Sequence, residues 1–278
     1  SMLDLNGQTL ANNIELEFRN TGDASNTGVL KNTDTATTAV LNGTLSIGGE
    51  NYVGGAGDMT LNGIVSGGTS NYSFFKQAAG TWTFTNEANT FDGFYYQIGG
   101  VTEVTKLANA GEASSLGQVS AGQNQIVFGF ADAGGGMIRY IGSSASTSDR
   151  AFSLRGSTAA ASNTIEAAGS SAAATLTLTG GLSANRAGSY TARLAGDNAG
   201  VNEYAGVIAN GSGTVTLEKT GTTTWALGGT NTYTGATAVS AGTLKVGNGS
   251  TTGTLGGGAV SVAAGAVLAF DRTDTPTV

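Results

Sequence analysis

The chain has 278 residues, with 46 glycines, a single proline, and neither histidine nor cysteine. The absence of histidine and cysteine excludes histidine-dependent nucleophilic triads and metal sites built on imidazole or thiolate ligands. The formal net charge of −7, with only 12 basic residues, excludes the basic surface that nucleic-acid binding requires, and no apolar run reaches the ~20 residues of a membrane-spanning helix.

Short runs in which a small polar residue alternates with an apolar one recur along the chain. Gly, Asn or Ser bounds each run, which is typical of short strands with one buried face. In chain order the runs are residues 44–47, 59–62, 81–84, 175–178, 214–217, 243–246 and 260–262. The best helical pattern, residues 105–116, is interrupted by Gly111 and predicts at most one short helical turn.

Two architectures use many short strands. A β-sandwich or barrel joins antiparallel strands by hairpins, and the six Asn-Gly or Asp-Gly pairs of this chain are compatible with hairpins. A parallel β-helix instead pairs strands about 20 residues apart and needs corner residues that tolerate positive φ. The near-absence of proline and the presence of a long internal repeat favour the β-helix.

The internal repeat has a period of 142 to 143 residues, with copies near residues 63–128 and 206–270. Its marker residues are Lys76, Trp82, Asn89, Gly93 and Gly100, which return as Lys219, Trp225, Asn231, Gly235 and Gly242. We expect both tryptophans on the same side of a rod, with Phe84 and Leu227 pointing the same way as their tryptophans. We expect the two asparagines to serve structure, because asparagine hydrogen-bonds backbone groups at corners.

Residues 211–246 read GSGTVTLEKTGTTTWALGGTNTYTGATAVSAGTLKV. This stretch resembles the autotransporter-associated β-strand repeat, whose pattern is Lys-Thr-Gly, a Trp or Leu strand, then Gly-x-Asn-Thr-Tyr-x-Gly-x-Thr-x-Val-x-x-Gly-x-Leu. The matching residues are Lys219, Thr220, Gly221, Trp225, Gly229, Asn231, Thr232, Tyr233, Gly235, Thr237, Val239, Gly242 and Leu244. Segments 3–7, 139–142 and 149–152 are similar to the flanking sequences of long bacterial surface proteins that carry this repeat.

The resemblance implies an all-β, right-handed, single-stranded parallel β-helix in the passenger region of a bacterial autotransporter or surface protein. With coils of 20 to 25 residues, residues 1–278 would form one solenoid of roughly 11 to 14 coils. The resemblance also implies an extracellular or cell-surface location. Because the pattern continues to the last residues, we expect the chain to be a piece of a longer protein and its partners to include neighbouring repeats of that protein.

The first copy departs from the second at one strand. Phe94, Tyr95 and Tyr96 stand where the second copy has Ala236, Thr237 and Ala238. In a strand, Phe94 and Tyr96 share one face and Tyr95 takes the other, so we expect at least one large aromatic to emerge from the rod. It either packs under a local loop, residues 71–75, or forms a platform for surface glycans or host proteins.

Catalytic constellations are missing from the sequence. The acidic residues are scattered, and the pair Glu15 and Glu17 is best explained as a solvated strand edge. Residues 54–58, Gly-Gly-Ala-Gly-Asp, approach a calcium-binding nonapeptide only once and with altered spacing, which favours a glycine turn. The glycines at 256–258 lack the lysine of a phosphate-binding loop. We expect no catalytic, cofactor or metal residue.

Three functions are compatible with these patterns. The leading hypothesis is a structural stalk that spaces another part of a longer protein from the cell surface, because a solenoid lengthens by adding coils. The alternative is an adhesin segment that binds carbohydrates or host surfaces through exposed aromatic side chains. A β-helical polysaccharide-degrading enzyme is the weaker alternative, since no acid and base pair is evident.

Overall fold

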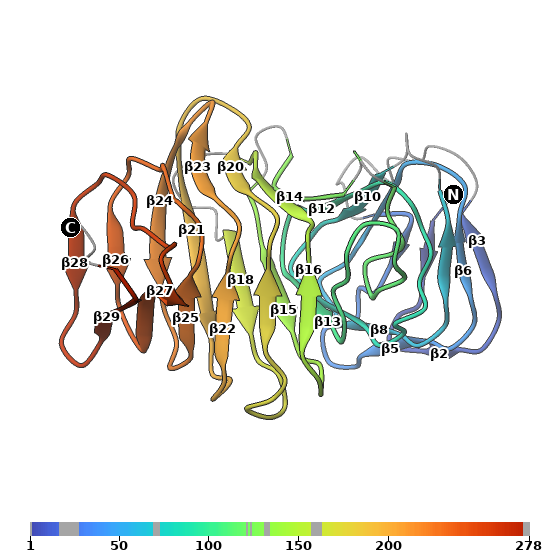
Figure 1. Ribbon diagram of the computed structural model, residues 1–278. Helices are drawn as coiled ribbons and strands as arrows, with labels where there is room; N and C mark the ends of the chain where they lie inside the picture. The colour runs from blue at the N-terminus through green and yellow to red at the C-terminus, as the bar shows by residue number, and fades with distance from the viewer. Residues whose placement is uncertain are drawn as a thin grey trace.

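The computed structural model describes residues 2–16, 28–68, 73–120, 122, 124–130, 134–156 and 163–274. Within these ranges the chain forms strands, turns and irregular segments but no helix, and every strand pair is parallel (Figure 1). The antiparallel hairpins considered above are therefore absent from the described part. The Asn6-Gly7 pair, for example, forms a corner between two strands that belong to different sheets.

Four sheets contain the strands. Sheet A comprises β1 (Leu3–Asp4), β4 (Leu30–Lys31), β7 (Asn51–Gly54), β10 (Ser73–Lys76), β12 (Phe94–Gln97), β14 (Gln125–Phe128), β17 (Ala151–Leu154), β20 (Leu182–Ala184) and β23 (Ile208–Gly211). Sheet B comprises β2 (Thr9–Leu10), β5 (Ala39–Leu41), β8 (Met59–Leu61), β11 (Thr81–Phe84), β13 (Val101–Val104), β15 (Met137–Tyr140), β18 (Asn163–Ala167), β21 (Ser189–Gly196), β24 (Thr214–Lys219), β26 (Thr237–Val239) and β28 (Val260–Val262).

The third face of the molecule is divided between two sheets. Sheet C comprises β3 (Ile14–Leu16), β6 (Leu45–Ile47) and β9 (Val65–Gly67). Sheet D comprises β16 (Ser146–Ser148), β19 (Leu176–Leu178), β22 (Val201–Tyr204), β25 (Thr224–Leu227), β27 (Thr243–Ser250) and β29 (Val267–Arg272). The chain visits A, then B, then the third face, and returns to A one layer further along, which is the path of a single-stranded parallel β-helix (Figure 1).

Sheet B is continuous from one end of the rod to the other. It holds 11 strands, one for each turn of the described chain, which agrees with the lower limit of the predicted coil number. Most register partners in this sheet are 20 to 25 residues apart in the sequence, as expected for one coil. Glu103 and Arg139 are also register partners but lie further apart, because a long segment between them leaves the coil. The right-handed sense of the coil stays a prediction.

The core is a set of columns in which one inward residue stacks on the next. Along sheet B, Leu41, Leu61 and Phe84 are consecutive register partners, and all three are buried. Because strand side chains alternate between faces, each coil contributes only every second residue to the interior. This explains why small polar residues alternate with apolar ones throughout the sequence.

Glycines at one corner permit close stacking of the backbone. A Cβ atom at Gly57 would lie 1.9 Å from the carbonyl oxygen of Asp34, and one at Gly80 would lie 2.1 Å from that of Gly57. No side chain fits at these distances, so adjacent coils can approach there only with glycine.

Residues 105–120 form turns and not the short helix considered from the sequence. This segment crosses the third face where neither sheet C nor sheet D has a strand. It is attached to the next coil by a bond from the Leu107 amide to Ser146 Oγ (2.9 Å) and one from the Ala110 amide to Asp149 Oδ1 (2.8 Å). The buried Arg150 adds a bond from Nη1 to the carbonyl of Leu116 (2.6 Å).

Candidate functional site

The two marker lysines close equivalent corners. Lys76 ends β10, and its Nζ donates to the carbonyls of Ala78 (3.1 Å), Gly99 (2.8 Å) and Gly80. Lys219 ends β24, and its Nζ donates in the same way to the backbone carbonyls of Thr220, Gly221 and Ala241, at 2.7, 2.9 and 3.1 Å. Both lysines are buried. In each copy the side-chain nitrogen joins the corner of its own coil to the corner of the next.

The expectation that the two tryptophans share one side of the rod is wrong. Trp82 lies in β11 of sheet B, whereas Trp225 lies in β25 of sheet D. The physical reason is that coil lengths vary, so the 143 residues between them do not make a whole number of turns. The local pattern persists, because both tryptophans are buried and Phe84 and Leu227 point inward beside them.

The marker asparagines bridge neighbouring coils through backbone groups. Asn89 Oδ1 accepts from the Val65 amide (2.7 Å), and its Nδ2 donates to the carbonyl of Ser115 (2.9 Å). Asn231 Oδ1 accepts from the Ile208 amide (2.8 Å), and its Nδ2 donates to the carbonyl of Thr254 (2.6 Å). Because the side-chain oxygen and nitrogen of each asparagine bond to backbone groups of different coils, the two side-chain amides hold neighbouring coils together.

The marker glycines allow tight corners and close contacts. Gly93, Gly100 and Gly242 have φ values of 123°, 64° and 63°, which other residues rarely adopt. A Cβ at Gly235 would lie 2.3 Å from the carbonyl oxygen of Val215.

The buried lysines make stability depend on pH. Desolvation lowers the pKa of Lys76 from 10.5 to about 7, although the nearby charge of Asp58 acts in the opposite direction. Between pH 7 and 10.5 the unfolded chain retains a proton that the folded chain has released, so the free energy of unfolding rises with pH. We expect thermal melts from pH 7 to 9.5 to show a steeper rise for the wild type than for Lys76→Met. Equal slopes would contradict this assignment.

Tyr95 is not available to a ligand. Its side chain points into the core, where it is fully buried, stacks on Phe74 at 5.5 Å between ring centroids, and hydrogen-bonds Thr102 Oγ1 at 2.7 Å. The prediction that Tyr95 takes the face opposite to Phe94 and Tyr96 is confirmed. However, because Tyr95 is buried, it cannot be part of the proposed ligand platform.

Tyr96 belongs to an aromatic stack on the outer face of sheet A, which we call the outer aromatic cluster: Tyr52, Phe75, Tyr96 and Phe130. The rings of Tyr52 and Phe75 are 4.2 Å apart, those of Phe75 and Tyr96 are 4.5 Å apart, and both pairs are nearly parallel. Phe130 packs edge-on against Phe75 and Tyr96, and the Arg155 guanidinium lies 5.3 Å from the Phe130 ring centroid. Only 7% of Tyr96 is exposed.

The structure thus favours packing over a ligand platform at this position. Phe94 is half-buried beside Tyr96. The loop expected to cover these rings was residues 71–75. Its Phe75 is part of the stack, and residues 71 and 72 lie outside the described residues. Sequence reasoning missed Tyr52 and Phe130. The spacing from Tyr52 to Phe75 equals one coil, which is the signal by which Tyr52 could have been found.

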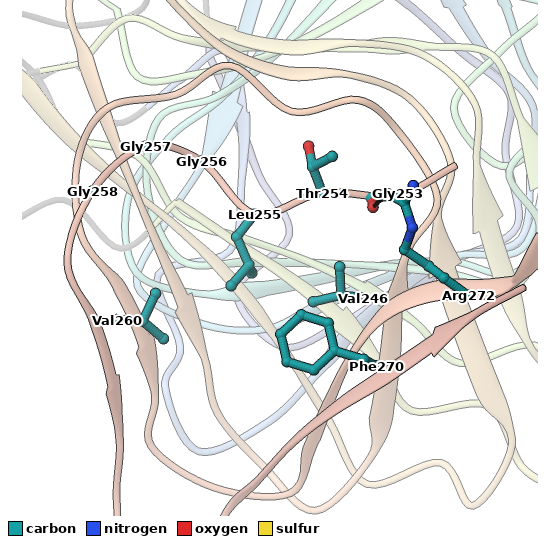
Figure 2. A pocket seen from close by; sticks show the side chains of 10 residues that line it. All are labelled: Val246, Gly253, Thr254, Leu255, Gly256, Gly257, Gly258, Val260, Phe270 and Arg272. Carbon is teal, nitrogen blue, oxygen red and sulfur yellow. Dashed lines mark hydrogen bonds between the residues drawn. The ribbon is translucent and has the colours of Figure 1, made fainter. Parts of the chain in front are cut away.

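A hollow of about 360 Å³ opens at the C-terminal end of the rod. Figure 2 shows Leu255, Val246 and Phe270 directed toward one another around it. Val246 and Phe270 are successive register partners of the buried Leu227, yet 44% of Phe270 is exposed. The hollow is therefore the uncovered end of the core column and not a separate site.

No metal centre is formed by the described residues, among which no three His, Cys, Asp or Glu side chains come together. Asp58, at the end of the candidate calcium segment, accepts a bond from the Thr81 amide at 2.7 Å. Glu15 is exposed on β3, and Glu17 lies outside the described residues. The described part also has no helix long and apolar enough to cross a membrane.

A parallel β-helix with one corner motif repeated on two of its faces belongs to the solenoid class of folds. The family model described as passenger-associated-transport-repeat matches residues 75–105 and 217–246, the two stretches that contain the buried lysines and tryptophans. Over 214 residues, 76% of the chain, the sequence is 37% identical to the adhesin BmaC autotransporter of Brucella suis biovar 1 (strain 1330). No solved structure matches the chain.

The chain therefore contains two passenger-associated-transport-repeat matches, and its similarity to an autotransporter adhesin supports an autotransporter passenger repeat region at the cell surface or in the extracellular space. The resemblance stated from the sequence is confirmed. The aligned part covers 6% of the length of the Brucella relative, so this segment corresponds to a small portion of such a protein.

Proposed function

We propose that this region is a stiff spacer within a longer passenger, one continuous solenoid that carries other segments away from the cell. The observation that supports the proposal is the continuity of sheet B through all 11 strands. Buried lysines, asparagines and glycines are used to hold one coil on the next, and this arrangement resists bending between coils.

We further propose that a neighbouring coil of the parent protein covers the hollow at the C-terminal end. Val260 lines the hollow and is exposed, as are Val262 and Val267 of the same last coil. Their partners Thr237, Val239 and Thr243 in the preceding coil are better covered. A coil stacked in the same parallel register would bury these side chains as the earlier coils bury theirs.

An adhesive role is the second candidate, supported by the name of the Brucella relative, an adhesin. We propose a non-catalytic role in either case. Incubation with acidic polysaccharides, followed by viscosity and reducing-end measurements, tests the enzymatic alternative, and any turnover would contradict our proposal.

Replacing the segment tests the spacer function. In cells that display the full-length protein, residues 2–274 are exchanged for an unrelated β-helix with the same number of coils, or deleted. We expect the exchange to preserve adhesion of the cells to host surfaces and the deletion to reduce it, because only the distance matters for a spacer. Loss of adhesion after the exchange, with normal surface display, would show that this segment contributes specific contacts.

A further inference from the structure

A groove of about 440 Å³ lies on the outer face of sheet B, across β15, β18, β21 and the corner after β24. It exists because Ala195 interrupts a column of long side chains. Glu103, Arg139 and Glu166 are consecutive register partners on this face, and the next partner is Ala195. Gly196 and Gly221 widen the space, and Asp197, Thr220 and Thr222 line its far side.

The charges around the groove are already paired. Arg139 Nε bonds Glu166 Oε2 at 2.8 Å, and Arg193 places both Nε and Nη2 within 2.9 Å of Glu218 Oε2. A charged ligand would have to compete with these ion pairs. A neutral hydroxyl group can instead donate to a carboxylate and accept from a guanidinium while both pairs remain in place.

A second observation points into the same groove. Thr164 lines it from the outer face of β18, because Ile165 and Ala167 of that strand point into the core. The residue is 1% exposed, and its Oγ1 has no hydrogen-bond partner among the described residues. An unpaired buried hydroxyl is unfavourable, and a ligand hydroxyl in the groove would supply the missing partner.

We propose that this groove binds a neutral carbohydrate, one or two hexose units long. The volume is within the range of small-ligand sites, and the lining offers hydroxyl, carboxylate and guanidinium groups together. Glu166 and Asp197 line the groove together with one arginine, Arg193, whose charge is already paired with Glu218, so acidic sugars are repelled. This site is separate from the outer aromatic cluster on sheet A, and its failure would leave the spacer function untouched.

The test measures binding of the folded chain to an array of neutral oligosaccharides and matched uronic-acid oligosaccharides, followed by calorimetry with the best neutral probe. Ala195→Leu fills the groove, and its control Ala238→Leu makes the same change on the outer face of β26. Thr164→Val removes the hydroxyl at constant shape, and its control Thr60→Val does so on β8. Melting temperatures report whether each variant folds.

We expect Ala195→Leu to weaken binding of the neutral probe by about tenfold or more and Thr164→Val by about fivefold, with both controls unchanged. Thr164→Val should also keep or raise the melting temperature, because it removes an unpaired buried hydroxyl. The proposal is overturned if no neutral oligosaccharide binds, if only uronic-acid oligosaccharides bind, or if the folded Ala195→Leu variant binds as tightly as the wild type.

Discussion

Replacing Trp225 with alanine is expected to lower the free energy of unfolding by about 3–5 kcal/mol, because a fully buried indole leaves a cavity that stacked coils cannot close. Trp82→Ala should cost a similar amount at the other copy. Thermal denaturation followed by circular dichroism gives the total effect. Hydrogen exchange should show the loss of protection in the coils that contain each tryptophan.

Phenylalanine substitutions separate the two tryptophans. Trp225 Nε1 donates to the carbonyl of Ala195 at 2.9 Å, whereas Trp82 Nε1 is buried without a partner among the described residues. Trp225→Phe should therefore cost about 1 kcal/mol more than Trp82→Phe. Equal costs for the two phenylalanine variants would contradict the hydrogen-bond assignment.

Alanine at Gly100 should be strongly disruptive for so small a change, with a loss of about 2–4 kcal/mol in the free energy of unfolding. The φ value of 64° strains any other residue. The added Cβ would also lie 2.6 Å from the carbonyl oxygens of Ala79 and Gly80, the latter a partner of Lys76, and it would touch the Lys76 ammonium. Chemical denaturation of the variant measures the combined effect.

Gly265 provides the matched control for Gly100. Its φ is 80°, but a Cβ there would meet nothing within 4 Å. Gly265→Ala should show only the backbone strain, about 1 kcal/mol. If both alanine variants lose the same stability, the crowded corner beneath Lys76 contributes nothing.

The fold could be predicted because the sequence patterns that specify it lie within single strands and single corners. Alternation in runs such as residues 214–217 follows directly from an interior on one side of each strand, and glycine-rich corners follow from close stacking. Coil length was less predictable, since the segment 105–120 is held by Ser146, Asp149 and Arg150, which lie far along the chain. Pattern alone cannot reveal such contacts.

The candidate sites were likewise predictable only where they depend on a single strand and not on contacts between coils. Alternation placed Tyr95 on the face opposite to Phe94 and Tyr96, as observed, but it did not say which face is the inner one. It did not reveal that Tyr52 and Phe130 cover Tyr96, because those residues come from other coils. The groove at Ala195 was also hidden, since a small residue becomes a hollow only when its register neighbours are long.

The change of face between the two copies affects what the rod presents to its surroundings. The outward-pointing residues next to Trp82 lie on the outer face of sheet B, and those next to Trp225 lie on the outer face of sheet D. Equivalent outer side chains are therefore distributed around the circumference and do not line up along the length. A flat surface that meets the rod from one direction can touch the outer residues of only one of these two copies at a time.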